Sequence, residues 1–111
     1  MSENRRQYPR FQFDKPVSYR PNETESAKGA LSRDISLGGI KMTVNEFVPF
    51  GSILEMGLDF PDLGKQVTVK GKVVWIRENP YSERFDIGIE FLPDEKTAAF
   101  VAAFLKKQKE K

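Results

Sequence analysis

The sequence predicts an all-β domain with one C-terminal helix, in which the strands form an antiparallel barrel or sandwich. Three observations predict this class: about six short segments of alternating apolar and polar residues, turn residues between them, and a change to helical spacing after Pro93. No long helical segment separates two strands, which argues against a parallel sheet. We expect a barrel rather than a sandwich because closure removes the exposed edges of a sheet.

Alternation of apolar and polar residues defines the expected strands. They cover residues 17–19, 30–37, 40–44, 53–60, 66–78 and 84–92. The alternation is weak over 30–37 and strict in the last segment. Residues typical of turns separate the segments. These turn residues are Pro21-Asn22, Gly38-Gly39, Pro49 to Gly51, Pro61 to Gly64 and Asn79-Pro80.

The last segment of the chain has helical spacing. Pro93 and Asp94 provide a helix start with an N-cap acceptor. The apolar residues that then recur at helical spacing are Phe100, Val101, Phe104 and Leu105. We expect a helix over about 94–109 that covers one open end of the barrel; the alternative is that its apolar face binds a partner.

The composition excludes most kinds of catalytic and metal site. The chain has 111 residues, which suits one domain, and it contains neither cysteine nor histidine. Disulfides, Cys/His zinc sites and Ser-His-Asp triads are therefore excluded. We expect a protein that is not an enzyme and that carries no cofactor or metal.

No apolar run approaches the roughly 20 residues that span a bilayer. The first residues also lack the apolar segment of a signal peptide. We therefore expect a cytoplasmic protein without a membrane span. The net charge of +2, from 18 Lys and Arg against 16 Asp and Glu, is nearly balanced, so the total charge does not favour a nucleic-acid partner.

Positive charge is nevertheless concentrated near the N-terminus, where Arg5, Arg6 and Arg10 lie within six positions. Guanidinium groups are planar forks that match phosphate oxygens and the O6/N7 edge of guanine. We expect residues 1–11 to form a flexible arginine arm ahead of a single domain over residues 12–111. The alternative is a tail that serves only solubility.

A second group of polar residues lies at the end of the strand expected over 30–37. In a regular strand, Asp34 and Ser36 point to one face, opposite Arg33 and Ile35. A carboxylate accepts from the N–H donors on the Watson–Crick edge of guanine, and a serine both donates and accepts. Gly38-Gly39 would permit positive φ and close approach of a ligand. The alternative is a hairpin in which the polar side chains only satisfy turn amides.

Together the two segments resemble the signature of the PilZ domain family. The residues that match are Arg6 and Arg10 in the first motif, followed by Asp34, Ser36 and Gly39 in the second. The resemblance covers nearly the whole chain, because two later segments are also similar to strands of the family. These segments are Gly71 to Trp75 and Ile87 to Phe91.

The resemblance implies a six-stranded β-barrel that binds the bacterial second messenger cyclic di-GMP. It implies that Arg6 and Arg10 clamp the guanine and phosphate groups, and that Asp34 and Ser36 line a site on the barrel surface. Gly39 is implied as a position that shapes the backbone. Because an arginine just outside the motif resembles members that bind a stacked pair of ligand molecules, we expect Arg5 to influence stoichiometry.

Arg5 to Phe11 contain few apolar anchors, so we expect this arm to become ordered when the ligand binds. The signal would pass to an unidentified protein partner through the arm, the ligand or the C-terminal helix. The resemblance suggests control of motility, exopolysaccharide secretion or virulence.

Two other functions remain open. One is a small nucleic-acid-binding β-barrel with a basic arm and surface aromatics. The balanced charge argues against it, as does the expectation that Trp75, Phe85 and Phe91 lie in the core. The other is a PilZ-like adaptor that binds protein but no nucleotide.

Overall fold

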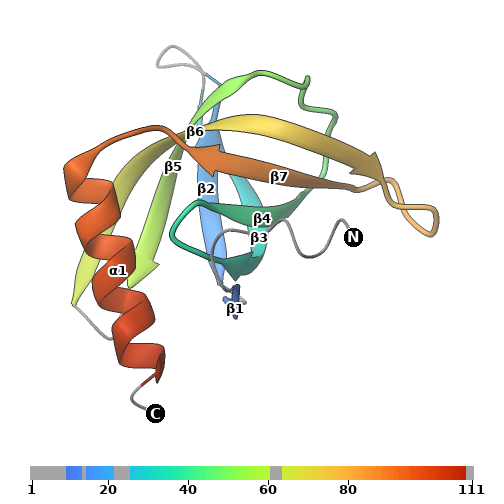
Figure 1. Ribbon diagram of the computed structural model, residues 1–111. Helices are drawn as coiled ribbons and strands as arrows, with labels where there is room; N and C mark the ends of the chain where they lie inside the picture. The colour runs from blue at the N-terminus through green and yellow to red at the C-terminus, as the bar shows by residue number, and fades with distance from the viewer. Residues whose placement is uncertain (1–9, 14, 22–25, 61–63, 110–111) are drawn as a thin grey trace, which may run out of the picture.

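The computed structural model describes residues 10–13, 15–21, 26–60 and 64–109 of the chain, and these ranges contain seven strands and one helix (Figure 1). The elements are β1 (Phe11–Gln12), β2 (Pro16–Arg20), β3 (Lys28–Ile35), β4 (Gly39–Val44), β5 (Ile53–Phe60), β6 (Lys65–Glu78), β7 (Phe85–Phe91) and α1 (Glu95–Lys109). All six predicted strands are present. The additional strand, β1, has two residues.

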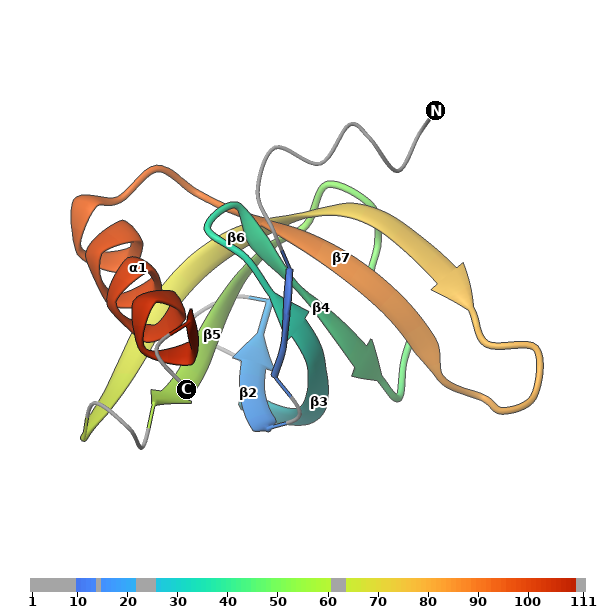
Figure 2. The ribbon, with the colours of Figure 1, turned by 60° about the horizontal axis from the view of Figure 1, so that its bottom comes forward.

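The strands close into an antiparallel barrel. Neighbours follow the order β3, β2, β5, β6, β7 and β4, and β4 pairs back onto β3, so that six strands form a complete ring. β1 pairs with the last residues of β3, and Figure 2 shows it in dark blue beside that strand. The structure therefore confirms the predicted six-stranded barrel, and β1 pairs with the end of β3 beyond the residues that pair with β2.

Inward-facing apolar side chains fill the barrel. In β4 the side chains of Ile40, Met42 and Val44 are fully buried, and in β5 every second residue from Leu54 to Phe60 is buried. This burial follows the period of two that places alternate residues of a strand on one face. Burying each such side chain contributes about 1.5–3 kcal/mol, which makes this alternation the main source of register specificity.

The helix α1 packs on one end of the barrel. The ring centroid of Phe104 lies 5.1 Å from those of Phe13 and Phe60, and Val101 is also buried. Figure 1 shows α1 beside β5 and β6, which agrees with the prediction that the helix covers an open end. In the part of the chain that the structure describes, no helix is long and apolar enough to cross a membrane.

Trp75 differs from its predicted place in the core. Its side chain is 37% exposed, and the indole lies over Gly88 on the neighbouring strand. A Cβ atom at position 88 would lie 2.1 Å from the indole Nε1, so the missing side chain of glycine makes room for the ring. A register shift in β6 between Val73 and Trp75 accompanies this arrangement, because a bulge changes which residues face outward.

Candidate functional site

The two sequence motifs meet where β1 pairs with β3. Phe11 lies opposite Ile35 and Gln12 opposite Asp34 in this pairing. The pairing brings Arg10 next to Asp34, and their Nη1 and Oδ1 atoms are 2.5 Å apart although the residues are separated by 24 positions. Both side chains are about one-quarter exposed, at 24% and 27%. The contact is a charge-assisted hydrogen bond that remains open to solvent on one side.

A bulge in β3 decides which side chains face outward at this corner. Ser32 pairs with Met42 and Asp34 pairs with Lys41, so Arg33 is an extra residue on its strand. Arg33 is exposed and Asp34 half-buried, whereas Ser32 is buried. The prediction that Arg33 and Asp34 lie on opposite faces is therefore wrong, because a bulge interrupts the alternation of a regular strand.

Arg33 belongs to a polar network that crosses four strands on the outer surface. Its Nε donates to the Thr43 hydroxyl at 3.0 Å, and that hydroxyl donates to Asp86 Oδ1 at 2.9 Å. Arg77 forms an ion pair with the other carboxylate oxygen of Asp86 at 3.3 Å. Motif reasoning from the sequence missed this network because its members come from β3, β4, β6 and β7.

Ser36 lies in the turn after β3 rather than in a regular strand. Its backbone N–H donates to the Gly39 carbonyl at 2.9 Å, and its hydroxyl accepts from the Gly38 N–H at 3.1 Å. The side chain is buried. The alternative kept open from the sequence, a hairpin serine that satisfies a turn amide, therefore describes Ser36 in this structure, and its contact with a ligand stays a prediction.

Gly39 is required by packing within the barrel. A Cβ atom at this position would lie 2.0 Å from the Ile89 carbonyl oxygen on β7. The close approach to Gly39 is thus made by the backbone of a neighbouring strand. Gly38 and Gly39 do not use the positive φ that glycine permits; the described glycines with positive φ are Gly51 and Gly64.

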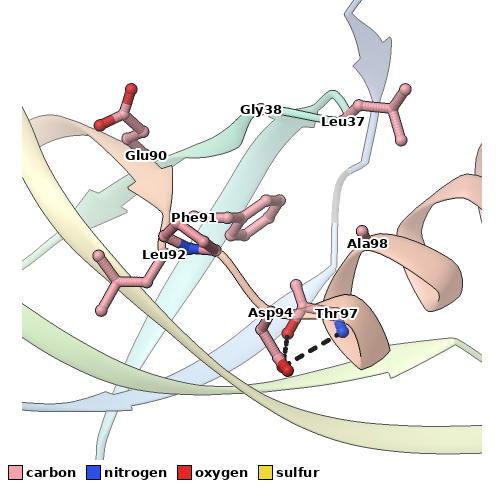
Figure 3. Close-up of a pocket in the computed structure, with 9 residues that line it drawn as sticks. Leu37, Gly38, Glu90, Phe91, Leu92, Asp94, Thr97 and Ala98 are labelled. Atoms are coloured by element: carbon pink, nitrogen blue, oxygen red, sulfur yellow. Dashed lines mark hydrogen bonds between the residues drawn. The ribbon is translucent and has the colours of Figure 1, made fainter.

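The turn also borders a pocket of about 400 Å³ between β7 and the start of α1 (Figure 3). Its lining residues are Leu37, Gly38, Glu90, Phe91, Leu92, Pro93, Asp94, Thr97 and Ala98. Neither Arg10 nor Asp34 lines it. We therefore place the candidate site at the Arg10–Asp34 contact on the barrel surface, and not in this pocket.

Asp94 at the edge of the pocket is the predicted N-cap of α1. Its Oδ2 accepts from the Thr97 hydroxyl at 2.7 Å and from the Thr97 N–H at 3.3 Å. These bonds, with the side-chain one contributing most, lower the pKa of the Asp94 carboxyl. The carboxylate is thus used in capping the helix.

The described residues leave part of the predicted site untested. Arg5 and Arg6 lie outside them, as does most of the arm expected to order on binding. Arg10, Asp34, Ser36 and Gly39 all lie at or near the β1–β3–β4 corner. Within the described ranges, no group of three or more Asp or Glu side chains is arranged to hold a metal ion.

Comparison with known proteins agrees with this fold. The sequence model of the PilZ domain family matches residues 4–105 of this chain. The Bacillus subtilis inhibitor of motility MotI/DgrA is 26% identical, with a TM-score of 0.73 over 96% of this chain and 53% of its own. The PilZ domain of Escherichia coli YcgR with c-di-GMP is 14% identical, with a TM-score of 0.68 over 96% of this chain and 95% of its own.

A third similar structure is the PilZ domain of CeSA from a cellulose-synthesizing bacterium. It is 13% identical, with a TM-score of 0.68 over 91% of this chain and 98% of its own. The chain spans about half the length of the Bacillus subtilis protein and nearly all of the two isolated domains. No curated protein sequence matches it significantly.

Proposed function

We propose, because this chain belongs to the PilZ domain family, that it binds cyclic di-GMP at the corner where Arg10 meets Asp34. The observation that carries the proposal is the contact between these two residues, which joins the two sequence motifs in space. Structural neighbours that bind c-di-GMP, among them the PilZ domain of YcgR, support the choice of ligand.

The chemistry of the corner suits a guanine dinucleotide. A guanidinium has five N–H donors, so Arg10 can hold Asp34 with one of them and offer others to a phosphate or to the O6/N7 edge of guanine. The carboxylate of Asp34 is an acceptor that suits the N1–H and N2–H donors of guanine. Arg10 and Asp34 thus offer the donors and acceptors that the two edges of the base require.

The arm supplies the remaining contacts in this proposal. Arg6 lies four positions before Arg10 and would hold a guanine or phosphate from the side opposite the barrel wall. Arg5 would favour a second, stacked ligand molecule. Ordering of Arg5 to Phe11 around the ligand would change the surface offered to a protein partner, which is how a receptor of this size would relay its signal.

The affinity expected from these contacts can be compared with a micromolar dissociation constant. A micromolar dissociation constant corresponds to about −8 kcal/mol. Hydrogen bonds to charged groups contribute about 1.5–3 kcal/mol each, so four or five contacts supply roughly 6–15 kcal/mol, from which the cost of ordering the arm is subtracted.

Isothermal titration with cyclic di-GMP tests the proposal. We expect binding by the wild type and a loss of at least tenfold in affinity for Arg6→Ala and Arg10→Ala. Arg84→Ala is the matched control, since Arg84 lies exposed in the β6–β7 turn, and it should bind as the wild type does. Absence of heat with the wild type would refute the proposal.

The same titration separates the alternatives. Single-stranded RNA that displaces the dinucleotide at lower concentration would favour a nucleic-acid-binding barrel, and no binding of either would favour a protein adaptor. Two equivalents bound by the wild type and one by Arg5→Leu would support the stacked pair. Identical stoichiometry would remove that role from Arg5.

A further inference from the structure

A cationic surface lies on the barrel wall beside Asp34 and includes residues outside both motifs. It consists of Arg10, Arg33 and Lys41. The pairing of β3 with β4 places Lys41 directly opposite Asp34, and the bulge turns Arg33 outward beside them. Paired residues on neighbouring strands have Cα atoms about 4.5–5.5 Å apart, so Lys41 and Arg10 both neighbour the carboxylate of Asp34, and Arg33 precedes Asp34 in the chain.

Two of the three cations already have partners. Arg10 is paired with Asp34 at 2.5 Å, and Arg33 donates to Thr43. Lys41 is half-buried, yet within the described residues it forms no ion pair and no side-chain hydrogen bond. An anionic ligand at this corner would give the Lys41 ammonium an opposite charge.

The other side of Lys41 faces strand β7. Its partner across β7 is Gly88, and the next residue in this row is Trp75 on β6. By contrast, Lys28 pairs with Glu46 and Lys72 lies opposite Glu90. Lys41 differs from these two lysines, because the acidic residues around it have other partners. Asp34 is paired with Arg10, and the diagonal neighbours on β7 are Asp86, which Thr43 and Arg77 hold, and Glu90, which lies opposite Lys72.

We infer that Lys41 is a further ligand-binding residue, which contacts a phosphate of the cyclic dinucleotide from the barrel wall. This inference rests on the proposed function. Cyclic di-GMP carries two phosphates; Arg10 contacts Asp34 from the side of β1, and Lys41 lies across from Asp34 on β4. A lysine acts on phosphate as a point charge, so its contribution depends on its charge more than on its shape.

The test compares Lys41→Gln and Lys41→Arg with a matched control. Lys70→Gln is that control, because Lys70 lies opposite Glu55, which Arg20 holds in an ion pair, on a different part of the barrel. Binding of cyclic di-GMP is measured by isothermal titration at low and physiological salt. Thermal unfolding of each variant is measured alongside.

We expect Lys41→Gln to weaken binding by about tenfold or more at low salt, and to make the affinity less sensitive to salt. Lys41→Arg should stay within about threefold of the wild type. Lys70→Gln should match the wild type, and all variants should unfold at similar temperatures. The inference would be overturned if Lys41→Gln lowered the melting temperature and Lys41→Arg restored that temperature but did not restore binding.

The failures of the two proposals are distinguishable. If the wild type binds and Lys41→Gln binds equally well, Lys41 has no part in the site while the proposed function stands. If the wild type does not bind, both proposals fail. If single-stranded RNA binds more tightly than the dinucleotide and is weakened by the same variant, the surface serves a polynucleotide and the assignment to cyclic di-GMP is overturned.

Discussion

Replacing Gly39 by alanine should destabilise the barrel even when no ligand is present. The added Cβ would lie 2.0 Å from the Ile89 carbonyl oxygen and 3.1 Å from the carbonyl carbon. Both are backbone atoms, so no side-chain rotation relieves the contact. Strand β4 would have to move away from β7 by more than 1 Å to reach an ordinary contact distance of about 3.4 Å or more.

The cost follows from overpacking and from weakened strand pairing. Overpacking of a tight site costs about 1–3 kcal/mol. Loss of one backbone hydrogen bond near the Gly39–Glu90 pair adds about 1 kcal/mol. We therefore expect Gly39→Ala to lower the free energy of unfolding by about 2–4 kcal/mol. For a domain of this size that corresponds to a melting temperature lower by roughly 8–16 °C.

Urea unfolding followed by circular dichroism and by fluorescence of Trp75 measures this cost. Gly29→Ala is the matched control, because Gly29 is also in a strand and a Cβ there would meet nothing within 4 Å. It should leave stability within about 0.5 kcal/mol of the wild type. A Gly39→Ala protein as stable as Gly29→Ala, but defective in ligand binding, would show that Gly39 serves the ligand and would refute the packing argument.

Three further predictions concern single side chains. Ser36→Ala should cost about 1 kcal/mol in urea unfolding, because it removes the acceptor of the Gly38 N–H; a variant as stable as the wild type would show that this hydrogen bond contributes nothing. Burial, with the nearby Glu46, raises the pKa of Tyr19 to about 12, so stability should fall between pH 10 and 12 as the unfolded chain ionises first; Tyr19→Phe should flatten this decline, and an unchanged slope would contradict it. The pKa of Asp94 is lowered, so its contribution is present above its unfolded pKa and is lost as pH falls through the folded value; Asp94→Asn should keep the cap and remove this acid dependence of the melting temperature, whereas an unchanged dependence would exclude the cap as its source.

Local patterns were sufficient for most of the fold. The alternation at Ile40, Met42 and Val44 predicted an inward face, and the structure buries all three side chains. Asp94 predicted the start of α1 because its side chain provides a capping acceptor, and it does so through Thr97. Such features depend on residues a few positions apart, so one chain segment contains the information.

The candidate site depended on contacts that no local pattern contains. The bulge that turns Arg33 outward exists only because β3 pairs with β4, and the indole of Trp75 has room on the surface only because Gly88 is its neighbour on β7. Such a register shift moves side chains from one face to the other. The alternation of apolar and polar residues along a strand therefore does not predict such a shift.

The sequence by itself determined the class of the domain, the positions of its strands along the chain, the helix and the two motifs, because hydrophobic periodicity and capping act within short segments. Only the tertiary structure decided that Arg10 meets Asp34, that Lys41 lies opposite the same carboxylate, and that Gly39 faces a neighbouring backbone. These relations join strands that are distant in sequence, and closure of the barrel sets their register.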